Sequence, residues 1–446
     1  MSEGPMSNND EPTVMLAARL QSLYLETHDP AYLDRAIEVA REGSRATQDS
    51  AVHLSQLCNA LRMRYELTGE LSDLNGAIDA GTACLEKTCR GHRSEDQRLS
   101  NLGFALRLRY ERLGTPDDIE RAVELGRRAV ESAQPGARGL SRLQSNLGVA
   151  LRVHFEVSSD VQDLEDAVAW GEACLAQAVA DSEVLPGMLA NLGLAYIEWY
   201  AAAGGREPLE RGIALMRRAT EATPEGDPDR PMYALNLSVA LRWLGEGEGD
   251  VRLLTSAIDA AEHAWRLLPP RHPERAACLS DLGRAQRLRA SLCGDVAEAR
   301  CAIGRRRQAA SLVVAPPRTR ALAAAAWGQW SCEDGDVREA LRGYTVAVKL
   351  LPQVAWLGLP GRARVRHVKG WAGLAEDAGA VAVAAGRPDE ALVLLEQGRT
   401  VFWNQILDMN RDLAALRSVD AGMYERMDGL RRLLDRGTRE LHRAAP

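Results

Sequence analysis

The chain has 446 residues, 46% of them hydrophobic, and a formal net charge of −7. This charge gives no overall basic character, which argues against a nucleic-acid-binding protein. No apolar run reaches the roughly 18 residues of a membrane helix, so no membrane span is predicted. Residues 1–12 are polar and lack the apolar core of a signal peptide. We expect them to be a disordered leader on a cytoplasmic protein.

After this leader, two markers recur along the chain at an interval of 45 residues. The first is a small residue before Ile or Val, with the small residue at Ala77, Ala122, Ala167, Gly212, Ala257, Ala302 and Ala347. The second is a small residue at Gly103, Gly148, Gly193, Ser238, Gly283, Gly328 and Gly373. Repeats of this length predict a solenoid, in which each unit buries its apolar face against its neighbours.

Residues 97–134 show what one repeat contains. Apolar residues follow helical spacing at Leu99, Leu102, Leu106 and Tyr110. Gly114 is expected to end this first helix, because glycine adopts the left-handed conformation that closes helices. Thr115 and Pro116 then have the residue types typical of the N-cap and the first position of a second helix. Each repeat is therefore predicted to be a helix–turn–helix hairpin.

The small residues of the two markers, such as Gly103 and Ala122, are expected to let the paired helices approach closely. Repeating this pattern along the chain predicts eight helical pairs and a ninth, divergent pair at about 371–400. The sequence thus predicts an all-α, right-handed α-solenoid over residues 13–314. Residues 315–446 are expected to hold divergent helical repeats and a capping or linker helix, at about 421–443.

The repeat units resemble tetratricopeptide (TPR) repeats, whose first helix carries N-L-G-x-A and whose second helix carries A-I or A-V. This long form looks like the repeats that precede CHAT domains, which are caspase-like cysteine proteases. The stretches AWLGL at 355–359 and LEQGR-x-x-x-W-x-Q-x-L-D at 395–408 strengthen this resemblance. It implies a scaffold that regulates such a protease, whose catalytic His and Cys would lie beyond Pro446. No catalytic residue is therefore assigned in this chain.

Two ladders of polar residues share the first-helix face that lines the inner groove in TPR proteins. One consists of Asn101, Asn146, Asn191 and Asn236, with Gln56 and Asp281 at its ends. The other consists of Arg62, Arg107, Arg152, Arg242 and Arg287, interrupted by Ile197. Carboxamides can hydrogen-bond a peptide backbone, and guanidinium groups can bind carboxylates through two parallel bonds. The ladders are therefore candidates for binding a protein or peptide partner, with the Arg ladder favouring an acidic one.

The same ladders have a structural interpretation, in which they satisfy carbonyls and carboxylates between helices, such as those of Glu111 and Glu156. A second hypothesis is a stand-alone repeat protein whose groove binds a small molecule or performs catalysis. That hypothesis requires a closed pocket lined by converging polar groups. A buried polar cluster around Arg107, Arg152 and Tyr196 would support it, and an open groove would count against it. A third hypothesis is a self-assembling structural protein.

Neither a metal nor a cofactor is predicted. The eight histidines show no H-x-x-x-H spacing, the eight cysteines form no C-x-x-C, and no phosphate-binding P-loop motif occurs. The cysteines are expected to be reduced and mostly buried. Tryptophans gather in residues 320–405, where most are expected to belong to the core.

Overall fold

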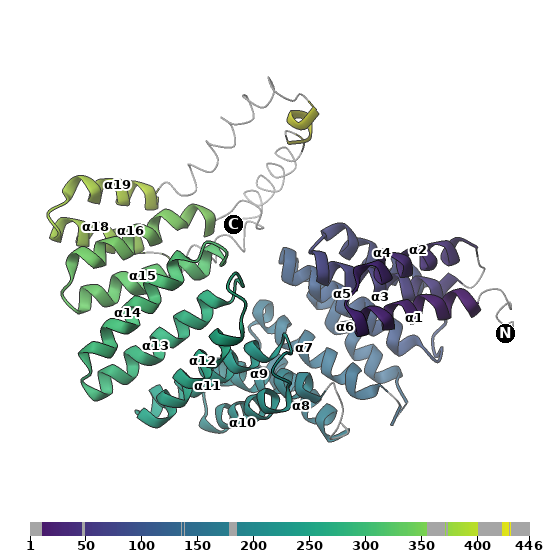
Figure 1. The fold of residues 1–446 in the computed structure, drawn as a ribbon. Helices are drawn as coiled ribbons and strands as arrows, with labels where there is room; N and C mark the ends of the chain where they lie inside the picture. The colour runs from purple at the N-terminus through teal and green to yellow at the C-terminus, as the bar shows by residue number, and fades with distance from the viewer. Residues whose placement is uncertain are drawn as a thin grey trace, which may run out of the picture. The chain divides into compact units, whose positions relative to one another are not determined.

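The structure is a computed structural model. It describes residues 11–46, 50–134, 136–137, 139–177, 185–354, 371, 373–399, 422–427 and 429. These residues form helices joined by short turns, without a strand among them (Figure 1). The predicted all-α solenoid of TPR-like helical hairpins is confirmed.

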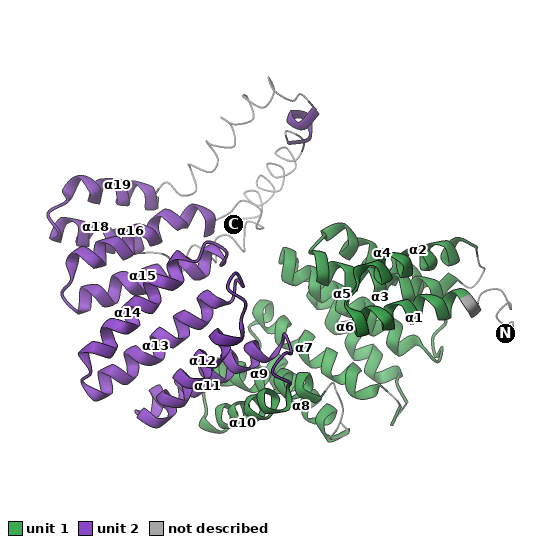
Figure 2. Cartoon of the chain, in the orientation of Figure 1, with its two compact units in different colours: residues 1–223 green, residues 224–446 purple. Residues whose placement is uncertain are grey.

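The chain divides into two compact units, residues 1–223 and residues 224–446 (Figure 2). The helices of the first unit are α1 Glu11–Thr27, α2 Pro30–Ala46, α3 Ser50–Thr68, α4 Leu71–Glu86, α5 Glu95–Leu113, α6 Pro116–Ser132, α7 Leu140–Ser158, α8 Val161–Gln177, α9 Leu185–Ala203 and α10 Arg206–Ala222. Those of the second unit are α11 Arg230–Glu248, α12 Val251–Leu267, α13 Arg275–Cys293, α14 Val296–Ser311, α15 Pro317–Glu333, α16 Val337–Val354, α18 Leu374–Ala384 and α19 Pro388–Arg399.

These helices pair as the sequence predicts, in eight hairpins followed by a ninth formed by α18 and α19. Residues 1–10 of the leader expected at 1–12 lie outside the described residues. Residues 11 and 12 belong to α1, which begins at Glu11. The division of the repeats at residue 314 stays a prediction. The terminal helix at 421–443 falls outside the described residues except for 422–427 and 429.

The hairpin of α5 and α6 shows how the sequence sets the helix ends. Gly114 follows α5 in the left-handed conformation, with φ of 70°, and its N–H bonds the Tyr110 carbonyl. Pro116 begins α6, where its missing N–H costs no helical hydrogen bond. Thr115 occupies the N-cap with extended backbone, but its side chain makes no capping hydrogen bond. The helix starts at the predicted residue without the capping contact that the threonine suggests.

The repeated glycines bring the backbones of each hairpin together. A Cβ atom at Gly103 would lie 3.3 Å from the Ala122 carbonyl oxygen, and one at Gly283 would lie 3.0 Å from that of Ala302. The expected close approach of the two markers is therefore confirmed in these hairpins. Gly373 breaks the series, because it is the N-cap of α18, with φ of 91°, rather than a residue inside a helix. The ninth hairpin is thus out of register with the others.

A continuous apolar core joins neighbouring hairpins. In the first unit one cluster of buried side chains extends from Ala17 in α1 to Val153 in α7. This continuity is what a solenoid requires, because each hairpin has too little apolar surface to fold alone. Of the tryptophans in residues 320–405, Trp327 is buried, whereas Trp330 and Trp371 are partly exposed. Trp356 and Trp403 lie outside the described residues.

Contacts between a basic and an acidic side chain join the two helices of several hairpins, and this repeated contact was not predicted from the sequence. In each pair a basic side chain of the first helix meets a carboxylate nine residues later, near the start of the second helix. The pairs are Arg64–Asp73, Arg109–Asp118, His154–Asp163 and Arg289–Glu298. These contacts link the first helix to the second helix in four of the hairpins.

Candidate functional site

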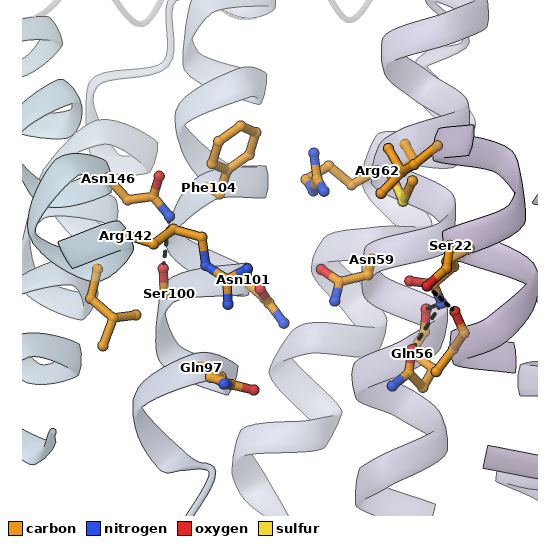
Figure 3. A pocket seen from close by; sticks show the side chains of 15 residues that line it. Ser22, Gln56, Asn59, Arg62, Gln97, Ser100, Asn101, Phe104, Arg142 and Asn146 are labelled. Atoms are coloured by element: carbon orange, nitrogen blue, oxygen red, sulfur yellow. Dashed lines mark hydrogen bonds between the residues drawn. The ribbon is translucent and has the colours of Figure 1, made fainter. Parts of the chain in front are cut away.

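A pocket of about 340 Å³ lies in the first unit, where the first helices of four consecutive hairpins come together (Figure 3). It is lined by Ala18, Gln21, Ser22 and Leu25 of α1, by Gln56, Asn59, Arg62 and Met63 of α3, by Gln97, Ser100, Asn101 and Phe104 of α5, and by Arg142, Leu143 and Asn146 of α7. Every lining residue thus comes from a first helix. The pocket therefore occupies the face on which the sequence placed both ladders.

Side-chain carboxamides dominate the polar lining of the pocket. Asn146 donates from Nδ2 to Ser100 Oγ at 3.1 Å, and Gln21 donates from Nε2 to Gln56 Oε1 at 2.9 Å. Among the described residues, the side chains of Asn59 and Asn101 have no hydrogen-bond partner. Figure 3 shows both extending toward the space between α3 and α5. Two groups that can both donate and accept thus face the pocket unused.

The charged groups that line the pocket are both cationic. Arg62 pairs with Glu66 through an Nη1–Oε2 contact of 2.5 Å, whereas Arg142 is exposed and forms no ion pair among the described residues. The guanidinium of Arg62 lies 4.6 Å from the centre of the Phe104 ring, and that of Arg107 lies 4.5 Å from it. These cation–π contacts hold the ring in place at the wall of the pocket.

The arginines of the predicted ladder all pair with carboxylates of the same chain. Arg107 pairs with Glu111 one helical turn later. The remaining pairs, besides Arg62–Glu66, are Arg152–Glu198 at 2.6 Å, Arg242–Asp281 at 2.7 Å, and Arg287 with Glu333 at 3.1 Å and Asp334 at 2.8 Å. Several of these pairs join one first helix to the next. Such contacts are those of the structural interpretation, so ligand binding by this ladder stays a prediction.

The asparagines of the other ladder have two kinds of surroundings. Asn101 and Asn146 line the pocket. Asn191 repeats the contact of Asn146, since its Nδ2 donates to Ser145 Oγ at 3.2 Å. Asn236 is partly exposed in α11 of the second unit and is not among the residues that line this pocket. The structure thus brings Asn101, Asn146 and the terminal Gln56 of this ladder together with Arg62, and leaves Asn191, Asn236 and Asp281 outside the pocket.

Four residues that line the pocket were not among the predicted site residues: Asn59, Gln97, Phe104 and Arg142. A signal for them exists in the helical spacing. Gln97 and Arg142 precede ladder asparagines by four residues, and Asn59 and Phe104 follow Gln56 and Asn101 by three. Residues three and four apart share one face of a helix. Extending each ladder by one turn in both directions would have found all four.

The polar cluster that would support a catalytic or small-molecule site is not formed by Arg107, Arg152 and Tyr196. The three residues have separate partners. Tyr196 hydrogen-bonds Glu172 at 2.9 Å and Arg211 at 3.0 Å. Arg107 and Arg152 pair with Glu111 and Glu198. Burial raises the pKa of Glu198, which Arg152 opposes and nearby Glu156 reinforces.

Within the described ranges, no group of three or more His, Cys, Asp or Glu residues is placed to hold a metal ion. None of the described helices is both long and apolar enough to cross a membrane. Of the cysteines expected to be mostly buried, four are exposed, which corrects that expectation: Cys89, Cys293, Cys301 and Cys332.

Comparison with known proteins finds similar folds among solved structures. No protein-family model matches the chain, and no curated protein sequence matches it. Among solved structures, the apo form of the quorum sensor NprR from B. thuringiensis is 11% identical, covers 78% of this chain and 89% of its own, and has a TM-score of 0.50. This similarity shows the fold alone.

Two further structures share less of the geometry. A Rap protein complexed with competence and sporulation factor is 13% identical over 80% of this chain and 98% of its own, with a TM-score of 0.42. The C-terminal part of a TPR repeat-containing protein from Cytophaga hutchinsonii is 13% identical over 66% of this chain and 93% of its own, with a TM-score of 0.41.

Proposed function

We propose that this chain is a binding scaffold, without catalytic activity of its own, that holds an extended peptide segment of a partner in the pocket of the first unit. The observation that carries the proposal is the lining, with unused carboxamides on Asn59 and Asn101 beside the exposed guanidinium of Arg142. Each carboxamide can donate to a peptide carbonyl and accept from a peptide N–H, as a neighbouring strand would. The quorum sensor NprR has a similar fold.

The distribution of these groups favours a segment several residues long. The carboxamides come from four successive first helices, so the possible hydrogen bonds are spread along the inner face rather than converging on one point. Phe104, Met63, Leu143 and Leu25 offer apolar surface beside them. Because the charged lining residues are cationic, a segment with an acidic side chain is favoured.

The test begins with selection of peptides from a displayed random library on the immobilised full chain. Selected peptides are then titrated calorimetrically against the wild type, Asn101→Leu and the matched control Asn236→Leu, which changes the same ladder position in the second unit. We expect Asn101→Leu to weaken binding about 10-fold, as loss of a hydrogen-bonding partner does, and Asn236→Leu to leave it unchanged. Equal affinity of all three proteins would contradict the proposal.

A second candidate function is the binding of a small molecule in the same pocket. Its volume of about 340 Å³ lies at the low end of small-ligand pockets. Failure of the library to yield any peptide, combined with saturable binding of a compound that Asn101→Leu abolishes, would favour this alternative. Catalysis there is disfavoured, because the lining contains no Asp, Glu, His or Cys side chain to transfer a proton or attack a substrate.

The resemblance to repeats that precede CHAT domains supports a more specific proposal, in which the scaffold regulates a caspase-like protease in the cytoplasm. The two most specific stretches of that resemblance lie outside the described residues, except for 395–399 in α19. Sequencing the native gene past the codon for Pro446 tests the link. A reading frame encoding a His–Cys dyad supports a protease in the same polypeptide, whereas a stop codon there favours a separate adaptor.

A further inference from the structure

Arg306 in α14 breaks the repeat pattern in the second unit. It stands four residues after the Ala302 marker, and the same position in the other hairpins holds Ala40, Gly81, Gly126, Gly171, Met216, Ala261 and Leu351. Each of these is glycine or apolar, because the position faces the next hairpin; a Cβ atom at Gly171, for example, would lie 2.6 Å from Leu192 Cδ1. A guanidinium at this position is therefore exceptional within the chain.

The surroundings of Arg306 do not satisfy its charge. The residue is 8% exposed, and its Nε is buried without a hydrogen-bond partner. None of the described carboxylates forms an ion pair with it. Its guanidinium lies over Trp330 of α15, 4.8 Å from the ring centre. A cation–π contact offsets only part of the free energy needed to remove an ion from water.

Neighbouring charges add to this imbalance. Burial, with Arg284 and Arg242 nearby, lowers the pKa of Arg306 to about 10, and Asp281 opposes this only in part. Asp281 is already engaged, since it accepts from Ser238 Oγ at 2.6 Å and from Arg242 Nε at 2.7 Å. Arg287, whose guanidinium lies 5.9 Å from the centre of the same Trp330 ring, is paired with Glu333 and Asp334.

We propose that Arg306, with exposed Arg284 beside it, binds an oxyanion, either a carboxylate or a phosphate group. The guanidinium presents five N–H donors in a fork that matches these planar or tetrahedral anions. Residue 284 occupies the same repeat position as Asn59 and Phe104, which line the pocket of the first unit, so it lies on the corresponding face of α13. The site is independent of the peptide pocket, because it consists of other residues in the other unit.

The test compares the full-length wild type with Arg306→Met, which restores an apolar side chain of the kind that Met216 provides. Melting temperatures are measured in sodium chloride, sodium phosphate and sodium acetate at matched ionic strength. We expect the wild-type Tm to rise by about 2–4 °C and to saturate with one of the two oxyanions. The anion that does so identifies the chemistry of the natural ligand.

In chloride, Arg306→Met should melt at a higher temperature than the wild type, because it no longer buries an unpaired ion. It should also lose the saturable response. Arg300→Met is the matched control, since Arg300 is exposed on the same helix, and should respond as the wild type does. A non-saturating rise shared by all three proteins reflects general stabilisation by excluded salts and would overturn the proposal. Absence of any response in the wild type would overturn it equally.

Discussion

For the substitution Asp281→Asn, the contacts in the structure and the residue usual at this repeat position predict opposite effects on stability. Four other repeats have Asn at the equivalent position, so reversion to the repeat residue would ordinarily be neutral or stabilising. In the structure, however, Asp281 is the only described carboxylate within 3 Å of the buried Arg242, whose side chain is 4% exposed. The carboxylate also accepts a hydrogen bond from Ser238, which is fully buried.

The expected magnitude follows from these contacts. Removing one partner of a buried ion pair costs about 3–5 kcal/mol, because the other ion stays buried without compensation. The carboxamide introduced by this substitution would retain one accepting oxygen, and Glu246 would stay 3.5 Å from Arg242. We therefore place Asp281→Asn at the lower end, about 3 kcal/mol less stable. For a unit of this size that loss lowers Tm by roughly 6–12 °C.

Urea denaturation followed by tryptophan fluorescence and by circular dichroism measures the loss. The double variant Arg242→Met/Asp281→Asn provides the control, because it removes both ions and should recover at least half of the loss. A stability of Asp281→Asn within about 0.5 kcal/mol of the wild type would refute the reasoning, and so would a double variant that is less stable than either single variant.

Three further predictions concern packing, pH and thiol reactivity. Gly343→Ala should destabilise the protein by about 1–3 kcal/mol in urea denaturation, because its Cβ would lie 2.5 Å from Gly328 N. By contrast, Gly304→Ala should stabilise it by about 0.5–1 kcal/mol, since a Cβ there meets nothing within 4 Å. Burial raises the pKa of Glu198, so the folded state favours its protonated form, and the stability due to that form is lost as pH rises through the folded-state pKa. The Tm of Glu198→Gln should therefore increase relative to that of the wild type as pH rises from 4 to 7. A Tm difference that does not change with pH would contradict this. At pH 8 a thiol reagent should rapidly modify the four exposed cysteines named above. The buried Cys58, Cys84, Cys174 and Cys278 should react only on unfolding, because the reagent cannot reach them. Burial also raises the pKa of Cys58 and Cys278 to about 12 and that of Cys174 to about 11.

The helical hairpins could be predicted because their signals are local. Gly114 and Pro116 determine helix ends through backbone conformation alone, and the small residues of each marker allow close approach wherever they recur. The ninth hairpin was harder to place, because Gly373 continues the interval of 45 residues but serves a different purpose, at a helix N-cap.

The site was predictable only in part, because a ladder read from the sequence cannot show which members already have partners. Arg152 and Glu198 are 46 residues apart, and their pairing depends on how successive first helices align. The same alignment leaves Asn101 open to the pocket while Asn146 is hydrogen-bonded to Ser100. Partners in the preceding or the following repeat therefore determine which polar residues remain free for a ligand.

The central claim is that the inner face of the first unit holds a peptide. The most direct measurement is photo-crosslinking of a library-selected peptide that carries a photoreactive residue, followed by mass spectrometry of the digested full chain. We expect crosslinks in α1, α3, α5 and α7, at residues that line the pocket, and we expect these crosslinks to be lost when unlabelled peptide competes. Crosslinks confined to the second helices α2, α4 and α6, or to the second unit, would contradict it.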